Sequence, residues 1–283
     1  MDCKLIAKLI ERCLYEDIGS GDITANSIVP TGANTKGIIH AKQSGVIAGL
    51  AVAEEVFRFL SADISFICKV KDGDKVEAGT ILAEVEGDAR TILTGERVAL
   101  NFLQRMSGIA TYTSFLVEKV KGYPVRVVDT RKTTPGLRMV EKYAVLAGGG
   151  YNHRYGLYDA VMIKDNHIKV AGGIAQAVAA AREKVSHMVK IEVEVEDLAG
   201  VAEALQAKAD VIMLDNMDIH TMGQAVAMIG GLALVEASGG INEETIAVIA
   251  KTGVDIISVG ALTHSAQALD ISLDIGKIKV GTK

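Results

Sequence analysis

Cationic side chains concentrate in residues 126–169 of this chain. The stretch holds eight lysines and arginines against four acidic residues, whereas the whole chain carries a formal charge of −5. An arginine offers a planar pair of donors to a carboxylate or phosphate, and a lysine adds a point charge. A local positive field in an acidic protein predicts a small, multiply anionic ligand and argues against nucleic acid. The candidates to contact that ligand are Arg131, Lys132, His153, Arg154 and Lys164.

Repeated strand patterns should position these side chains. Short apolar runs rich in β-branched residues alternate with alanine-rich helical stretches, at residues 125–128, 160–163, 190–193, 211–214, 232–235 and 256–259. This alternation predicts parallel βαβ units and an α/β barrel, in which chemistry lies at the C-terminal strand ends. The residues at those ends are Asp129, Lys164, Glu194, Asp215, Ser238 and Gly260. A doubly wound sheet is the alternative, but it usually carries a GxGxxG after the first strand, where this chain has Thr130-Arg131-Lys132.

Glu194 and Asp215 end consecutive predicted strands and could face each other. Two carboxylates in a basic pocket could hold Mg²⁺, bind sugar hydroxyls or stabilise a cationic transition state. Charge balance with the arginines is the alternative. The last two strands end in Ser238-Gly239-Gly240 and Gly260-Ala261. Their glycines would let backbone N–H groups approach a phosphate, or would serve only a tight turn.

Two further cations allow more than one interpretation. Lys164 could form a Schiff base, clamp an anion, or pair with its neighbour Asp165. Arg105 lies on the apolar stripe of a long predicted helix, residues 94–121, one heptad after Val98. A guanidinium there needs an anion, which could be a ligand or a structural carboxylate, or else it must reach past the helix to solvent.

The first hundred residues have a different pattern. A helical segment is followed by short alternating runs with turns at Gly45, residues 72–74 and Gly79, which predicts an antiparallel α+β domain. We therefore expect a sandwich domain with its connecting helix at 1–110, a catalytic barrel at 111–268, and a segment at 269–283 that packs back on the first domain. The three cysteines form no CxxC pair, and no apolar run is long enough for a membrane span, so we expect a cytosolic protein.

The order and spacing of these motifs resemble the quinolinate phosphoribosyltransferase family over essentially the whole chain. The matching segments are residues 129–138, Lys142-Tyr143-Ala144, Gly148-Gly149-Gly150, Asn152-His153-Arg154, residues 164–167, Glu192-Val193-Glu194, Leu214-Asp215-Asn216 and residues 237–240. The resemblance implies an incomplete α/β barrel joined to an N-terminal open-faced sandwich. It also implies a Mg²⁺-dependent reaction in which quinolinate and phosphoribosyl pyrophosphate give nicotinate mononucleotide, pyrophosphate and CO₂, for NAD biosynthesis.

The resemblance also assigns roles to residues. Lys132, Lys164, Glu194 and Asp215 would be catalytic, with Glu194 and Asp215 toward Mg²⁺ and the ribose. Arg105 would reach the quinolinate of a partner subunit in a homodimer with shared sites, or in a hexamer. The implied substrate-binding set is Arg105, Thr130, Arg131, Lys132, Arg138, His153, Arg154, Lys164, Glu194, Asp215, Ser238, Gly239, Gly240, Ser258, Val259, Gly260, Ala261 and His264.

Three alternatives follow from the same residues. A molybdenum-transport paralogue shares the Asp-Thr-Arg-Lys segment, but the intact Lys164-Asp165-Asn166-His167 argues against it. A Schiff-base aldolase would use Lys164 covalently. A phosphosugar sensor would bind the same ligands without releasing pyrophosphate.

Overall fold

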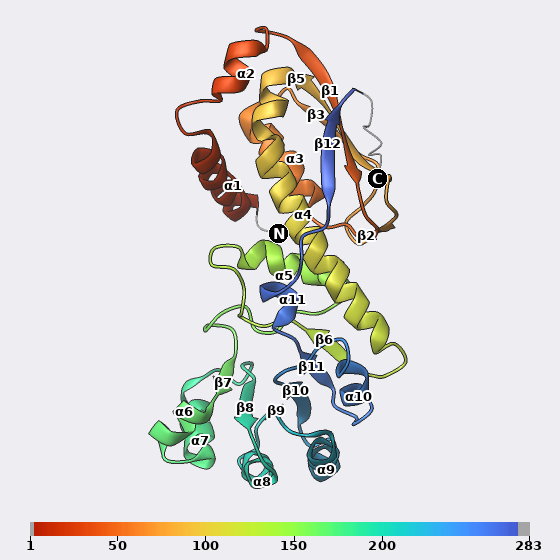
Figure 1. The fold of residues 1–283 in the computed structure, drawn as a ribbon. Helices are drawn as coiled ribbons and strands as arrows, with labels where there is room; N and C mark the ends of the chain where they lie inside the picture. Colours follow the sequence, from red (N-terminus) through yellow and green to blue (C-terminus); the bar gives the residue numbers. More distant parts are fainter. Residues whose placement is uncertain (1–2, 277–283) are drawn as a thin grey trace. The chain divides into compact units, whose positions relative to one another are not determined.

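The computed structural model describes residues 3–276, which form two compact units (Figure 1). Unit 1 comprises Met1–Ser114, Thr134–Gly149 and Ala266–Lys283 within that described range, and unit 2 comprises Phe115–Thr133 and Gly150–Ser265. Residues 134–149 thus cluster with unit 1, although they fall within the expected barrel segment. The expected domain boundaries stay a prediction.

Unit 1 is built on an antiparallel sheet with the strand order β12-β1-β5-β3. Its strands are β1 (Asn34–Ala41), β2 (Gly45–Val46), β3 (Ser65–Cys68), β4 (Lys75–Val76), β5 (Ile81–Asp88) and β12 (Ile271–Ile275). Its helices are α1 (Cys3–Ile18), α2 (Ile23–Ile28), α3 (Leu50–Leu60), α5 (Arg138–Ala147) and the first part of α4 (Ala89–Lys119). Figure 1 shows α3 and the start of α4 on one face of the sheet, which confirms the predicted sandwich.

Strand β12 closes one edge of this sheet. It pairs antiparallel with β1, from Gly37 opposite Ile275 to Ala41 opposite Ile271. The segment expected to return to the first domain therefore contains a strand of that domain. Residues 277–283 of the same expected segment lie outside the described residues.

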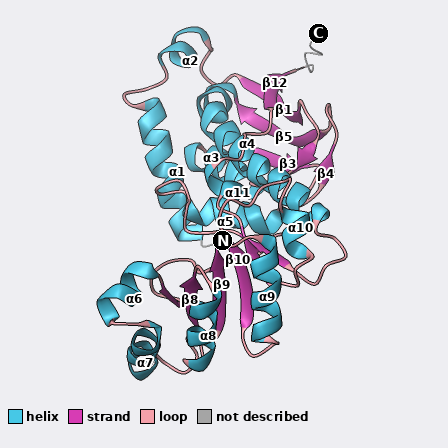
Figure 2. Ribbon diagram, turned by 60° about the horizontal axis from the view of Figure 1, so that its bottom comes forward, coloured by secondary structure: helices cyan, strands magenta, loops and turns pink. Residues whose placement is uncertain are grey.

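Unit 2 contains a parallel sheet with the order β6-β11-β10-β9-β8-β7. Its strands are β6 (Arg126–Val128), β7 (Val161–Ile163), β8 (Ile191–Val195), β9 (Val211–Asp215), β10 (Leu234–Ser238) and β11 (Ile256–Ser258). Its helices are α6 (Asp165–Ala171), α7 (Ile174–Lys184), α8 (Leu198–Gln206), α9 (Ile219–Ile229), α10 (Ile246–Ala250) and α11 (Ala261–His264). In the described chain the edge strands β6 and β7 do not pair, which confirms the predicted incomplete barrel. Figure 2 shows α8 and α9 beside β8, β9 and β10.

Side-chain alternation gives the strands of unit 2 two distinct faces. In β8, Ile191, Val193 and Val195 are buried, and the carboxylates occupy the intervening positions Glu192 and Glu194. In β9, Met213 and Asp215 share a face because successive side chains point to opposite sides of a strand. Asp197 and Asp218 then begin α8 and α9, since their side chains accept hydrogen bonds from Gly200 N and from His220 N.

Several strands of unit 2 end later than the sequence predicted, and Glu194 and Asp215 lie inside β8 and β9. Strand β10 runs to Ser238, so Glu236 lies inside the strand and not after it. Helix α5 begins at Arg138, with Leu137 as its N-cap. Gly136 has φ of 83°, a left-handed conformation that cannot continue a right-handed helix. No helix within residues 3–276 is long and apolar enough to cross a membrane.

Candidate active site

A cavity of about 430 Å³ lies in unit 2 and collects most of the predicted site residues. The predicted residues that line it are Thr130, Arg131, Lys132, His153, Arg154, Lys164, Glu194, Asp215, Ser238, Gly239, Gly240 and Ser258. Four predicted residues of unit 2, namely Val259, Gly260, Ala261 and His264, are outside this lining, and Arg105 and Arg138 belong to unit 1. The sheet therefore brings the cations and carboxylates of five strand ends together.

Arg154 is the most constrained cation of the cavity. Its Nη1 donates to Ala160 O at 3.4 Å and its Nη2 lies 3.5 Å from Met162 Sδ, while its buried Nε has no hydrogen-bond partner among the described residues. Burial and then the nearby Arg131 guanidinium lower the pKa of Arg154. Two like charges close together, one of them with an unmet buried N–H, favour an anion between them, because the anion offsets their repulsion and accepts from that N–H.

Lys164 pairs with Glu194 across neighbouring strands. The Lys164 Nζ donates to Glu194 Oε2, and the backbone of Lys164 forms the N-cap of α6 with its N–H donated to His167 Nδ1 at 3.0 Å. Asp165, the partner considered from sequence, pairs instead with Lys169 at 2.9 Å. Helix geometry explains this choice, because residues four apart lie on the same helix face.

Glu194 and Asp215 lie on the adjacent strands β8 and β9 and both line the cavity. Asp215 Oδ2 accepts a hydrogen bond from Asn216 Nδ2 at 2.8 Å. This donor set of carboxylate oxygens fits Mg²⁺, which proteins often bind through one or two carboxylates together with substrate phosphates.

The turn after β10 places backbone groups at the cavity. Asn216, with φ of 54°, donates its N–H to Ser238 O at 2.9 Å. Gly239 has φ of 96°, and a Cβ at this position would lie 2.2 Å from Asn216 Oδ1. A glycine is therefore needed here for the turn itself, and the same absence of a side chain leaves the backbone accessible. A second glycine, Gly260, packs against Lys132 and His264, since a Cβ there would meet their side chains at 3.1 and 3.2 Å.

Arg105 is paired within unit 1. Its Nη2 and Nε donate to Glu141 Oε1 at 2.9 and 3.2 Å, and its Nη1 donates to Ala266 O at 2.9 Å. The Glu141 side chain is fully buried and that of Arg105 is 28% exposed. The structural carboxylate that sequence offered as one alternative is therefore present. The role of Arg105 toward a partner subunit stays a prediction.

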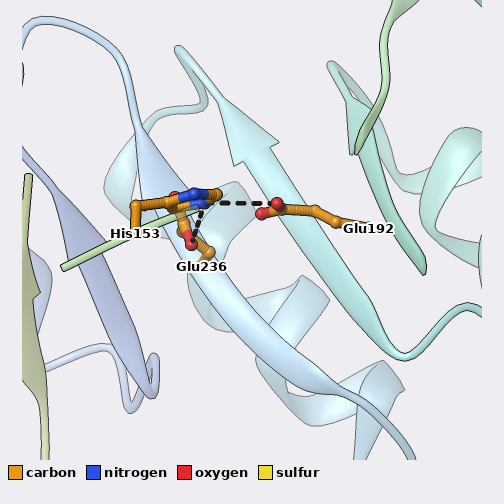
Figure 3. Close-up of side chains that lie close together, drawn as sticks. All are labelled: His153, Glu192 and Glu236. Atoms are coloured by element: carbon orange, nitrogen blue, oxygen red, sulfur yellow. Dashed lines mark ion pairs between the residues drawn. The ribbon is translucent and has the colours of Figure 1, made fainter. Parts of the chain in front are cut away.

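His153 contacts two buried carboxylates that lie on the same face of the sheet (Figure 3). Its Nε2 is 3.2 Å from Glu192 Oε2 and 3.4 Å from Glu236 Oε2. Burial lowers the pKa of His153, but the hydrogen bonds to Glu192 and Glu236 outweigh it and raise this pKa to about 10. Burial raises the pKa of Glu192. The sequence predicted that His153 binds an anionic ligand, and in the structure its ring contacts two carboxylates of the protein itself.

Four cavity residues were not predicted from the sequence: Met162, Met213, Asn216 and Glu236. The sequence contains a pattern from which two of these residues could have been predicted. Asn216 directly follows Asp215, and Glu236 lies two residues before Ser238, a spacing that puts both side chains on one face of a strand. The two methionines carry no such signal, because an apolar residue in a strand is equally suited to the core.

Comparisons with known proteins agree along the chain. The family model for the quinolinate phosphoribosyl transferase C-terminal domain matches residues 109–274, and that for the N-terminal domain matches residues 22–107. A Bacillus subtilis protein is 47% identical over 270 residues, covering 95% of this chain and 93% of its own length. Its name is probable nicotinate-nucleotide pyrophosphorylase (carboxylating).

Two further relatives extend the match. A Nicotiana tabacum quinolinate phosphoribosyltransferase (decarboxylating) is 43% identical and covers 94% of this chain and 81% of its own. The solved structure of the nicotinate-nucleotide pyrophosphorylase from Francisella tularensis superposes with a TM-score of 0.94 at 42% identity, covering 98% of both chains.

Proposed function

This chain belongs to the quinolinate phosphoribosyl transferase family, and we propose on that basis that its cavity joins quinolinate to phosphoribosyl pyrophosphate. The products are nicotinate mononucleotide, pyrophosphate and CO₂, and the reaction supplies NAD biosynthesis. One observation carries the assignment to this site. A single cavity combines the cations Arg131, Arg154 and Lys164 with a carboxylate pair and a glycine turn.

The chemistry needs each of these groups. As pyrophosphate leaves ribose C1, an oxocarbenium-like positive charge develops, which nearby carboxylates stabilise. The quinolinate ring nitrogen then forms the new bond to C1, provided that the two carboxylates of the ring are held in line by cations. Loss of the adjacent carboxyl group as CO₂ leaves its electron pair on the carbon beside the pyridinium nitrogen, and that carbon takes up a proton.

The family resemblance supports roles for individual residues that line the cavity. Arg131, Arg154 and Lys164 bind the quinolinate carboxylates in this proposal, and Lys132 binds the phosphates. Gly239 and Gly240 present backbone at the 5′-phosphate. Glu194 and Asp215 face the ribose in this proposal and would hold Mg²⁺, which would supply positive charge next to the pyrophosphate. We place the enzyme in the cytosol as a homodimer in which Arg105 completes the partner's site.

One assay tests the function directly. The protein is incubated with quinolinate, phosphoribosyl pyrophosphate and Mg²⁺, and nicotinate mononucleotide and pyrophosphate are quantified. Nicotinate in place of quinolinate is the matched control, because a ligand that lacks one carboxylate forms fewer charge-assisted hydrogen bonds with these cations. Comparable turnover of nicotinate would contradict the assignment.

Two further experiments on this protein distinguish the transferase from the alternative functions. Borohydride trapping of a covalent adduct at Lys164 would identify Schiff-base chemistry. Tight binding of phosphoribosyl pyrophosphate and quinolinate without pyrophosphate release would identify a sensor. The family match supports the transferase instead, and the Lys164 Nζ is already engaged in an ion pair with Glu194.

A further inference from the structure

Two buried carboxylates that contact the cavity residue His153 have no role in the proposed reaction. Glu192 lies on β8 and Glu236 on β10, and Figure 3 shows both pointing at the ring of His153. Their exposed fractions are 5% and 1%. The Oε1 atom of each is buried without a hydrogen-bond partner among the described residues. Carboxylates left in this state cost stability, so packing alone does not explain them.

The hydrogen bonds of His153 define where its ring proton lies. The backbone N–H of Arg154 donates to His153 Nδ1 at 2.7 Å, which requires the lone pair of that nitrogen. The ring hydrogen is then on Nε2, where both carboxylates accept it. The carboxylates raise the pKa of His153, but the Arg154 N–H opposes the second ring proton, because a proton on Nδ1 would have to displace this hydrogen bond. A metal at this cluster would need the Nε2 lone pair instead, so the geometry favours a hydrogen-bonded cluster over a cation site.

The same contacts reach Arg154. Asp129, which is fully buried, accepts the His153 N–H at 2.9 Å and the Asn152 side-chain amide at 2.6 Å. The carboxylates Glu192 and Glu236 hold the other end of His153. His153, the residue before Arg154, is therefore held at its backbone N–H and at its ring. The buried Nε of Arg154 has no hydrogen-bond partner within the described part of the chain.

We propose that Glu192 and Glu236 are positioning residues for quinolinate, which hold His153 by Nε2 and, through its Nδ1, orient Arg154 toward a substrate carboxylate. This inference rests on the proposed function of the cavity. Both residues act through His153 and need not touch the substrate. Their loss should therefore change the recognition of quinolinate more than that of phosphoribosyl pyrophosphate.

Methionine substitutions separate positioning from stability. Glu236→Met and Glu192→Met keep the side-chain length and remove the acceptor. Each single variant leaves His153 Nε2 one carboxylate acceptor and removes a buried carboxylate with an unmet oxygen, so the melting temperature should not fall. The KM for quinolinate should rise roughly tenfold or more, and that for phosphoribosyl pyrophosphate should stay within about twofold. Equal rises in both KM values with a lower melting temperature would show a merely structural role and overturn the proposal.

Two matched variants sharpen this result. Glu236→Gln keeps an oxygen that can accept from Nε2, so it should restore a KM for quinolinate close to that of the parent. Glu96→Met removes a half-buried carboxylate of unit 1 and should leave both KM values unchanged. A Gln variant as impaired as the Met variant would mean that charge, and not the hydrogen bond to His153, is what matters, and would overturn the positioning role.

A double-mutant cycle with His153→Ala tests the route. If Glu236 acts through His153, Glu236→Met should add almost nothing to the effect of His153→Ala, whereas independent effects would add.

Nitrogen NMR of the ligand-free protein gives a readout independent of activity. His153 should show one tautomer protonated at Nε2, and the Glu192→Met/Glu236→Met variant should lose it. An unchanged tautomer overturns the inference, while a wild-type protein that shows the tautomer but forms no nicotinate mononucleotide overturns the proposed function.

Discussion

Buried carboxylates in the two units are satisfied to very different degrees. Glu141 of unit 1 accepts from Arg105 Nε and Nη2 and from the backbone and hydroxyl of Thr134, so both of its oxygens are used. Glu192 and Glu236 of unit 2 contact His153 through one oxygen each, and the other oxygen of each has no partner among residues 3–276. Both kinds of carboxylate are almost inaccessible to solvent.

The difference indicates what each group does. A carboxylate with every acceptor position used fixes local structure, here by joining α4, the 134–137 turn and α5. A carboxylate pair with unmet oxygens costs stability and persists where it serves a site. Of the two, only the second lies at the cavity, because Glu236 is part of its lining. Five experiments test this contrast.

Arg105 tests the comparison most strictly. It hydrogen-bonds Glu141, the carboxylate whose oxygens both have partners, and yet we propose that it acts in a partner's site. Arg105→Ala and Lys164→Ala should each be nearly inactive, since each removes a charge that holds the substrate. In a randomly reassociated dimer population, about half of the molecules are heterodimers with one intact site each, so activity should return to roughly a quarter of the wild-type level. No recovery despite subunit exchange, verified by mass spectrometry, would make Arg105 structural.

The carboxylates at the cavity mouth should affect chemistry. Glu194→Gln and Asp215→Asn should each lower kcat by about 100-fold, because they weaken stabilisation of the charge that develops on ribose. The KM for quinolinate should change little. If steady-state kinetics show loss of quinolinate affinity alone, the carboxylates act on the pyridine ring and our assignment is wrong.

Glu141→Met tests the satisfied member of the comparison. It leaves the Arg105 guanidinium and the Thr134 N–H without their acceptor and should lower the free energy of unfolding by about 2–3 kcal/mol. Urea denaturation measures this change, with Glu236→Met as the matched variant that should not be destabilised. Equal stability losses in the two variants would remove the distinction between the regions.

The two glycines after β10 differ in their surroundings. Gly239→Ala should lower the free energy of unfolding by about 2 kcal/mol, because a Cβ would strike Asn216 in addition to adopting a left-handed φ. At Gly240, with φ of 60°, a Cβ meets no heavy atom within 4 Å, so Gly240→Ala should cost about 1 kcal/mol. Denaturation gives both values, and the affinity for phosphoribosyl pyrophosphate should fall more for Gly239→Ala.

Tyr143 gives the smallest effect, at high pH. Burial and then its hydrogen bond to Asp72 raise the pKa of Tyr143 to about 12, above its ordinary value of 10.0. The stabilisation is fully present below pH 10 and is lost as the pH rises toward 12, because the unfolded chain releases this proton first. The residue is partly exposed, so we expect at most about 1 kcal/mol. Tyr143→Phe should flatten the decline in melting temperature between pH 10 and 12.

The sequence predicted the fold and the cavity to different depths. The hydrophobic periods and the predicted strand ends placed Lys164, Glu194 and Asp215 at one edge of a parallel sheet, because alternating strands and helices allow few chain topologies. The same pattern could not give the partners of these residues. Lys164 pairs with Glu194, thirty positions away, and not with adjacent Asp165, since partner choice depends on the register between strands.

Buried polar contacts were the least predictable part. Glu192 and Glu236 each look like a residue at a strand end or on a solvated strand face, and neither one alone signals a pairing with His153. Their contact depends on β9 lying between β8 and β10, which sets both carboxylates on one face. Helix and strand periods indicate which face of an element a residue occupies. They do not indicate which side chains from other elements contact that residue.

The pairing of β12 with β1 has a consequence for synthesis on the ribosome. Strand β1 is made early, but its partner on one side, β12, emerges only after all of unit 2. Until then β1 presents one unpaired backbone edge, the kind of surface that pairs with other chains. Unit 1 can therefore finish folding only after unit 2 has been synthesised. Variants that slow the synthesis of unit 2 should lengthen the period in which the nascent chain depends on chaperones.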